Sequence, residues 1–300
     1  ADFSRDGQRF QYLPSSYVSS VSPSLGPASG GSSLRVRGLG FASTGDLGCV
    51  FVAAGSVSDS AGAASLGAVS AGRWLSSGQL VCDSPSAGSV PGLSSEGGLV
   101  DVFVTTNGVD VSDSSASFEL HGSVTVSGVS PLSGGMAGGT AVRVSGSGFA
   151  FGSGLSCRFG EDSTSAQYVS STEVVCVSPA LSGVGSNESS VSVAVSVSRN
   201  GIDFGSSSGT FLYERGAVVS SVSPSTGVVG GGTAVVVSGS GFENRTGLSC
   251  RFGSSGSVPA VYVNSSAVRC VSPPASSALP SGGADGGTVS VEVSVNGADF

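Results

Sequence analysis

Six cysteines are the residues in this chain of 300 with the clearest chemistry, which is oxidation in pairs. They form three sequential pairs, 33, 19 and 20 positions apart: Cys49 and Cys82, Cys157 and Cys176, Cys250 and Cys270. An even number of regularly placed cysteines indicates disulfide bonds and an oxidising compartment. Several connectivities are open to six cysteines, and the repetition favours one bond inside each repeat. Each bond would stabilise its unit by about 3 kcal/mol.

Residues for acid–base or nucleophilic catalysis are scarce. The one histidine, His121, follows an expected last strand near the start of the next repeat, where a linker role is expected. Gly205-Ser206-Ser207-Ser208-Gly209 fits the Gly-x-Ser-x-Gly pattern but lies between a hairpin and a strand, not at a strand-to-helix elbow. The Gly230-Gly231-Gly232 run precedes no helix, and the chain has no lysine to complete a phosphate loop. The sequence therefore predicts a protein that is not an enzyme and has no cofactor.

Recurring aspartates raise the question of a metal site. Asp2, Asp110, Asp203 and Asp299 each stand alone, three residues after the asparagine of an Asn-Gly pair wherever that pair is present. Calcium prefers about six to eight oxygen ligands, which no cluster here offers. We therefore expect these carboxylates to form hydrogen bonds within turns, and we expect no metal.

Three Asn-x-Ser/Thr sequons begin at Asn187, Asn244 and Asn264 in a chain with six asparagines. In a secreted protein such sequons accept N-linked glycans on surface loops. Chance occurrence in a serine-rich sequence is the alternative. We predict glycosylation at all three positions.

The charge balance excludes several kinds of partner. The net charge is -8, the charged fraction is 11%, and all 12 basic residues are arginines. No basic stripe is present to contact phosphates, so nucleic acid is not expected as a partner. No apolar run reaches the roughly 18 to 20 residues of a membrane span, which predicts no direct membrane insertion. Residues 1–10 do not have the form of a signal peptide, so a mature segment is expected.

Three copies of one pattern position these residues. They open at Val21-Ser22-Pro23, Val129-Ser130-Pro131 and Val222-Ser223-Pro224, 108 and 93 residues apart. That spacing is typical of one immunoglobulin-like domain per copy. Abundant glycine, serine and valine also favour strands and turns over helices. The expected fold is all-β, made of tandem immunoglobulin-like β-sandwiches with one disulfide per module.

Each copy carries the same strand signals. Apolar and polar residues alternate at 33–37, 141–145 and 234–238, which predicts strands with one buried face. Each strand ends on Gly-x-Gly-Phe, where glycine permits unusual backbone angles and the phenylalanine anchors the corner in the core. Phe51, Phe159 and Phe252 stand two positions after a cysteine, so ring and sulfur both point inward.

The closing strands differ among the copies. Alternating strands are expected at 99–105, 191–197 and 289–295, each leading into an Asn-Gly hairpin. A last strand then carries Phe118-Glu119-Leu120 in the first copy and Phe211-Leu212-Tyr213 in the second, whereas the third copy reaches Phe300 without one. Residues 1–13, with Phe10-Gln11-Tyr12, match this last strand and its approach.

These patterns define four segments. They are 1–16, the final strand of a preceding or partner module; 17–121, module 1; 122–215, module 2; and 216–300, module 3, which lacks its last strand. Strand 1–13 is expected to complete such a sandwich. Either the segment is a window of a longer covalent array, or the strand is donated to another chain, because an unpaired sheet edge accepts strands. Ala298-Asp299-Phe300 repeats Ala1-Asp2-Phe3 at a period of about 297 residues, close to three sandwiches, which fits the continuous array slightly better.

The combined motifs resemble the IPT/TIG domain over essentially the whole chain. The match is densest at Gly138-Gly139-Thr140 with Cys157-Arg158-Phe159-Gly160, and at Gly231-Gly232-Thr233 with Cys250-Arg251-Phe252-Gly253. The first copy departs from the pattern with Gly30-Gly31-Ser32 and an insertion around 57–71. The resemblance implies arrays of such modules on cell-surface proteins such as plexins, growth-factor receptors and fibrocystin-like coat proteins.

Two functions are compatible with this organisation. The first is an extracellular structural protein that forms a stalk, coat or filament and whose partners are other copies of itself and glycans. The alternative is a ligand-binding or adhesion ectodomain of a cell-surface receptor, in which one module binds and the others act as spacers. The loop expected over 53–73 in module 1 is the place where a binding surface would lie.

Overall fold

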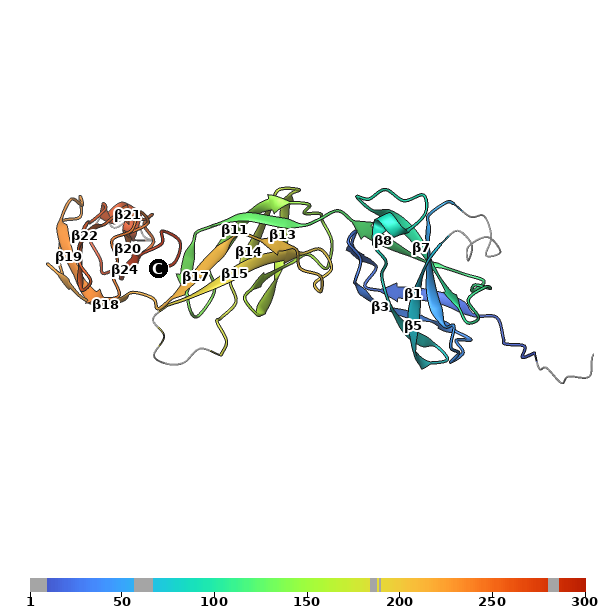
Figure 1. The fold of residues 1–300 in the computed structure, drawn as a ribbon. Helices are drawn as coiled ribbons and strands as arrows, with labels where there is room; N and C mark the ends of the chain where they lie inside the picture. The colour runs from blue at the N-terminus through green and yellow to red at the C-terminus, as the bar shows by residue number, and fades with distance from the viewer. Residues whose placement is uncertain (1–9, 57–66, 184–187, 189, 280–285) are drawn as a thin grey trace, which may run out of the picture. The chain divides into compact units, whose positions relative to one another are not determined.

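The computed structural model describes residues 10–56, 67–183, 188, 190–279 and 286–300. The chain divides into two compact units, Ala1–Val124 and Thr125–Phe300. Module 1 lies in the first unit, and modules 2 and 3 lie in the second (Figure 1). Asp2, Asn187 and most of the insertion in module 1 lie outside the described residues.

Module 1 is a sandwich of two strand layers. One layer joins β1 (Tyr17–Ser22), β3 (Ser33–Leu39), β6 (Gln79–Asp83) and part of β5 (Ala68–Ser76). The other joins the rest of β5 with β4 (Gly48–Ala53), β7 (Gly98–Thr105), β8 (Ala116–His121) and β2 (Leu25–Pro27). A single turn of 3-10 helix, η1 (Ala87–Ser89), links β6 to β7.

Module 2 repeats this order. Its first layer contains β9 (Thr125–Ser130), β11 (Ala141–Ser147), β14 (Glu173–Val177) and part of β13 (Asp162–Ser170), with β16 (Ser206–Ser207) at its edge. Its second layer contains the rest of β13 with β12 (Ser156–Phe159), β15 (Ser190–Ser198), β17 (Thr210–Glu214) and β10 (Ser133–Gly135).

Module 3 has the same first layer and a smaller second one. The first joins β18 (Val218–Ser223), β19 (Ala234–Ser240), β23 (Ala267–Val271) and β22 (Val261–Asn264). The second joins β21 (Val258–Pro259), β20 (Ser249–Phe252) and β24 (Val291–Ser294). A four-residue helix, α2 (Ala275–Ala278), follows β23.

One disulfide joins the two layers in each module. Cys49–Cys82 links β4 to β6, Cys157–Cys176 links β12 to β14, and Cys250–Cys270 links β20 to β23. The Cα atoms of each pair are 6.2 to 6.3 Å apart. All six cysteines are buried, as are the aromatic rings two positions after each first cysteine. The predicted fold class, with one disulfide per module, is confirmed.

The glycine corners have a steric cause. In module 2, a Cβ added at Gly146 would lie 2.0 Å from the carbonyl oxygen of Thr125 and 2.6 Å from the Phe149 ring. Only glycine therefore allows the strand and the ring to approach so closely. Two residues later, Gly148 adopts a φ of +77°, which L side chains disfavour. Modules 1 and 3 repeat this arrangement at Gly38 and Gly239.

Two expectations from the sequence are corrected. The loop expected over 53–73 is shorter, because Ala68 pairs with Phe51 and Ser70 with Cys49, which places 68–73 in β5. The strand expected at 289–295 covers only β24, Val291–Ser294, and the cause lies in the missing neighbour described below.

Candidate functional site: an open groove in module 3

Modules 1 and 2 each hold their last strand in the same slot. In module 2, β17 pairs antiparallel with β15 and parallel with β10, and in module 1, β8 pairs likewise with β7 and β2. Phe211 lies opposite Val193 and Tyr213 opposite Val191. In module 1, Phe118 lies opposite Val100 and Leu120 opposite Gly98. The last strand thus closes one edge of each sandwich.

Alternate residues of this strand fill the core. Phe118, Leu120, Phe211 and Tyr213 are at most 1% exposed. The Phe211 ring packs edge-on against Phe159, with centroids 5.4 Å apart, and the Phe118 ring packs against Phe51 at 6.4 Å. Burying each of these large side chains stabilises its module by about 2–3 kcal/mol.

Tyr213 also makes a polar contact at the end of the slot. Its hydroxyl donates a hydrogen bond of 2.9 Å to the carbonyl oxygen of Pro179. Burial, with the nearby Asp162 carboxylate as a second cause, raises the pKa of Tyr213 to about 12. The neutral phenol is therefore the form that the folded module holds.

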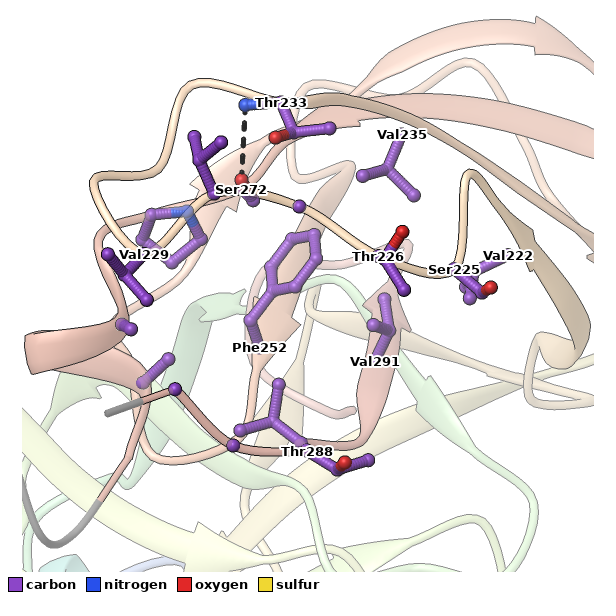
Figure 2. A pocket seen from close by; sticks show the side chains of 18 of the residues that line it. Val222, Ser225, Thr226, Val229, Thr233, Val235, Phe252, Ser272, Thr288 and Val291 are labelled. Atoms are coloured by element: carbon purple, nitrogen blue, oxygen red, sulfur yellow. Dashed lines mark hydrogen bonds between the residues drawn. The ribbon is translucent and has the colours of Figure 1, made fainter. Parts of the chain in front are cut away.

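The same slot is open in module 3. A cavity of about 300 Å³ lies between the two layers, and Figure 2 shows the Phe252 ring and Val291 pointing into it. Phe252 pairs with Val291 in module 3 as Phe159 pairs with Val195 in module 2. Phe252 is therefore the counterpart of Phe159, and Val291 is the counterpart of Val195. The rest of the lining is apolar, glycine, serine or threonine, and it includes Thr226, Gly227, Val228, Val229, Thr233, Val235, Ser272, Ala278, Leu279, Gly287 and Val289.

Gly26, Gly134 and Gly227 occupy the same position in the three modules, and their surroundings differ. A Cβ on Gly26 would lie 3.0 Å from the Phe118 ring, and one on Gly134 would lie 2.8 Å from the Phe211 ring. The same Cβ on Gly227 would meet the Thr233 side chain at 2.8 Å, and none of its three nearest atoms is aromatic. Module 3 therefore keeps the glycine that makes room for a ring, without a ring beside it.

The backbone edges of the groove are also open. The counterpart of Gly98, where β7 begins, is Gly287, yet β24 begins four residues later at Val291. The counterparts of β2 and β10 in module 3 are residues 226–228, which form no strand. Both flanking strands therefore lose the part that pairs with a last strand elsewhere in the chain.

The described residues that line the groove are apolar, glycine, serine or threonine. None of the described residues that line it is acidic, basic, histidine or cysteine. Within the ranges that the structure describes, no group of three or more His, Cys, Asp or Glu is placed to hold a metal ion. An apolar slot between two backbone edges is suited to binding a β-strand.

The residues singled out in the sequence have structural positions. His121 is the last residue of β8, not a residue beyond it, and it is buried. Ser206 and Ser207 form β16, which pairs with β9, so no nucleophile elbow exists there. Asn244 and Asn264 are exposed, as glycan acceptors must be.

The aspartates complete turns, as expected. In each module, an asparagine Nδ2 donates to the aspartate Oδ2 three residues later at 2.8 Å: Asn107 to Asp110, Asn200 to Asp203, and Asn296 to Asp299. The asparagine Oδ1 accepts the aspartate backbone N–H in all three turns.

The junction of modules 2 and 3 was not predicted. Arg245 forms a two-pronged ion pair with Glu214, with Nη1 to Oε2 at 2.6 Å, and also donates to Ser133 at 3.1 Å. The Glu214 carboxylate raises the pKa of Arg245 above its already high value. Asn296 donates to the Ser133 carbonyl oxygen at 2.8 Å, and Thr140 donates to Asp299 at 2.6 Å. No periodic sequence signal connects these distant residues.

The chain was compared with curated proteins and with solved structures. A comparison with curated proteins gave no match. The chain is similar to the plexin A4 extracellular region, with 19% identity and a TM-score of 0.44, over 90% of this chain and 22% of the plexin chain. It is also similar to FdeC, an Escherichia coli adhesin, with 14% identity and a TM-score of 0.25, over 96% of this chain and 95% of that one.

The family comparison covers nearly all of the sequence. The model of the IPT/TIG domain matches residues 16–120, 124–213 and 217–300. These three matches correspond to the three sandwiches, each with its disulfide, glycine corner and Asn-Gly turn. The chain belongs to the IPT/TIG domain family, as three tandem copies of that domain.

Proposed function

We propose that the chain is a segment of an extracellular structural protein, a stalk, coat or filament that is assembled from tandem IPT/TIG modules. The observation that carries the proposal is the junction of modules 2 and 3. Two of its hydrogen bonds end on Asn296 and Asp299, which belong to a turn present in all three modules. A repeated turn that bonds to the neighbouring module is suited to stacking modules at fixed spacing.

A short linker restricts the movement of modules 2 and 3 relative to each other. The linker from the end of β17 to the start of β18 is only residues 215–217. The Glu214 side chain, 12% exposed, is held by Arg245 from module 3. Charge-assisted, bidentate pairs in partly buried settings are stronger and more directional than exposed ion pairs. Such a linkage supports a load-transmitting role better than that of a flexible tether.

An extracellular location is consistent with the covalent chemistry. All six cysteines are consumed in disulfides, which persist in oxidising compartments. Asn244 and Asn264 stand exposed for glycans. No helix among the described residues is long and apolar enough to cross a membrane.

Electron microscopy of the native material tests this function, with mass spectrometry of the same sample for glycans and chain mass. We expect regular assemblies with a repeat set by these modules, and glycans on Asn187, Asn244 and Asn264. Dispersed chains that flex freely between modules 2 and 3 would overturn the structural role.

A second candidate is a binding ectodomain. The observation that favours it is Trp74 on β5 of module 1, which is 42% exposed next to Leu75 at 36%. An exposed tryptophan is the kind of residue that anchors protein or carbohydrate partners. A Trp74→Ser variant that still assembles but no longer retains a surface ligand would support this role.

A further inference from the structure

Three arginines lie together on the outer side of the first layer of module 1. Arg35 and Arg37 belong to β3, and Arg73 belongs to β5. On the intervening strand β6, Val81 pairs with both Arg35 and Arg73, and Gln79 pairs with Arg37. Residues directly opposite each other on paired strands point to the same side of a sheet. Arg35, Arg37 and Arg73 therefore share one surface, the arginine face of module 1.

The arginine face points away from the core. The alternate residues of β3 and β6 face inward and are at most 1% exposed: Leu34, Val36, Leu80 and Cys82. All three arginines are exposed. Strand geometry places the Cα atoms of Arg35 and Arg37 about 7 Å apart, and those of Arg35 and Arg73 about 10 Å apart. Three guanidinium groups thus lie within reach of a single extended partner.

No carboxylate pairs with the arginine face. In the part of the chain that the structure describes, none of its three guanidinium groups forms an ion pair. Asp83, at the end of β6, is the one acidic residue of β1, β3, β5 and β6, and it pairs with Ser33. The outer side of these strands therefore carries three positive charges against one negative charge, in a chain whose net charge is -8.

The equivalent surface of module 2 is neutralised. Val175 takes the place of Val81, because it pairs with Arg143 on β11 and with Gln167 on β13. Arg143 forms an ion pair with Glu173. The single arginine of this row is therefore already paired with a carboxylate, and a neutral glutamine replaces the second.

The equivalent surface of module 3 has one arginine and a sequon. Arg269 lies between two valines in the row that contains Arg35 and Arg73 in module 1. Asn264, a predicted glycan acceptor, lies on the adjacent strand at the position of Ser76 in module 1. No sequon begins within module 1. Module 1 therefore differs from both other modules, because its surface is cationic and has no predicted N-linked glycan.

We propose that the arginine face of module 1 binds an anionic polysaccharide, one that carries sulfate or carboxylate groups along its length. A guanidinium group is planar and always charged, and its N–H donors match two oxygens of such an anion. A linear polyanion that lies across β3, β6 and β5 reaches all three groups. The inference goes beyond the proposed structural function and does not depend on it.

Other polyanions match this surface less well. Proteins that hold single-stranded nucleic acid supply aromatic rings on which bases stack. The outward positions of β3 and β6 contain no aromatic residue: Ser33, Arg35, Arg37, Leu39, Gln79, Val81 and Asp83. Three disulfides also indicate an oxidising, extracellular environment, where acidic polysaccharides are abundant.

Affinity chromatography of the 300-residue chain tests the proposal. Immobilised heparin is the sulfated probe, polygalacturonate is the carboxylated probe, and dextran is the uncharged control. We expect the chain to bind the acidic polymers and not dextran, and to elute as salt screens the charges. The acidic polymer that retains the chain to the higher salt concentration identifies the preferred anionic group.

Substitutions of the arginines locate the site. Arg35→Ser, Arg37→Ser and Arg73→Ser are each expected to weaken binding roughly threefold, and the triple change roughly 30-fold, as for exposed ion pairs. Because all three side chains are exposed, module 1 stays folded, which circular dichroism and thermal unfolding verify. The matched control is Arg269→Ser. It removes one exposed arginine from the equivalent surface of module 3, changes the net charge equally and binds like the wild type.

A change at Asp83 should act in the opposite direction. Asp83→Ser removes the one carboxylate of these strands and is expected to strengthen binding roughly twofold. Damage to the fold cannot produce a gain in affinity. A gain in this variant, together with losses in the arginine variants, therefore assigns binding to the arginine face.

Three outcomes overturn the inference. A wild-type chain that neither acidic polymer retains at physiological salt has no such site. Equal losses in Arg73→Ser and Arg269→Ser show a response to overall charge and not to the arginine face. Equal or tighter binding to single-stranded DNA, or to vesicles that contain phosphatidylserine, assigns the face to another class of partner. Each measurement uses dispersed chains, so its result is independent of whether the native material forms regular assemblies.

Discussion

Modules 2 and 3 are nearly the same sandwich with and without a last strand. Both have the inter-layer disulfide, the glycine corner and the Asn–Asp turn. In module 2, β15 spans Ser190–Ser198 and β10 is formed, whereas in module 3, β24 spans only Val291–Ser294 and no strand forms at 226–228. One strand therefore determines whether its two neighbours are ordered.

The comparison also separates two parts of each module. The layer that contains β18, β19, β22 and β23 keeps the pairing that β9, β11, β13 and β14 have in module 2. The layer that receives the last strand changes most, while the first layer of module 3 lacks only a counterpart of β16 among the described residues. The disulfide and the first layer are thus sufficient to define the sandwich, and the last strand supplies core volume and edge pairing.

The largest effect is expected from removing a last-strand ring of module 2, so that its core resembles that of module 3. Phe211→Ala removes a fully buried ring and is expected to destabilise module 2 by about 3–5 kcal/mol. Amides of residues 190–194 should then exchange hydrogen as fast as those of residues 286–290. The control is Phe151→Ala, a change at a ring 86% exposed, which should cost less than about 0.5 kcal/mol. Unchanged protection at 190–194 would refute the ordering role of the strand.

Removal of a disulfide should have the second-largest effect on stability, and that effect should differ between modules 2 and 3. The double change Cys157→Ala and Cys176→Ala is expected to cost about 3 kcal/mol and to leave module 2 folded on its remaining core. The same change at Cys250 and Cys270 should abolish protection throughout module 3, because its core already lacks the last-strand rings. Calorimetry and hydrogen exchange on both variants would measure this. Similar losses in the two modules would contradict the comparison.

The ion pair at the junction should have a smaller effect. Glu214→Gln leaves Arg245 with a weaker acceptor and is expected to cost about 1–2 kcal/mol of coupling between modules 2 and 3. Thermal unfolding followed module by module would show the two transitions separating. The matched control is Glu243→Gln, since Glu243 also pairs with Arg245 but is 52% exposed. An equal effect of both changes would mean that Glu214 has no special role.

Much of this architecture could be predicted from the sequence. The repeat length, the alternating strands and the phenylalanines after each first cysteine led to three sandwiches with one disulfide each. The reason is that these signals are local or periodic.

Other features could not be predicted because they depend on contacts between distant residues. Arg245 meets Glu214 and Ser133 across a module boundary, and neither spacing nor composition marks such a partner. The expected loop over 53–73 was too long because residues 68–71 pair with β4 despite their weak alternation. Tertiary pairing determined the start of β5 where local sequence did not.

The smallest effect concerns Tyr213 in module 2 and depends on pH. The unfolded tyrosine ionises near pH 10, whereas burial raises the pKa of Tyr213 to about 12 in the folded module. Stability from the neutral phenol is therefore fully present below pH 10 and declines as the pH rises from 10 to 12. Tyr213→Phe should lose about 1 kcal/mol at neutral pH with the Pro179 hydrogen bond, yet show a weaker decline above pH 10. Urea unfolding at pH 8, 10 and 11 would measure both trends. An identical alkaline decline in the variant would show that Tyr213 is not the titrating group.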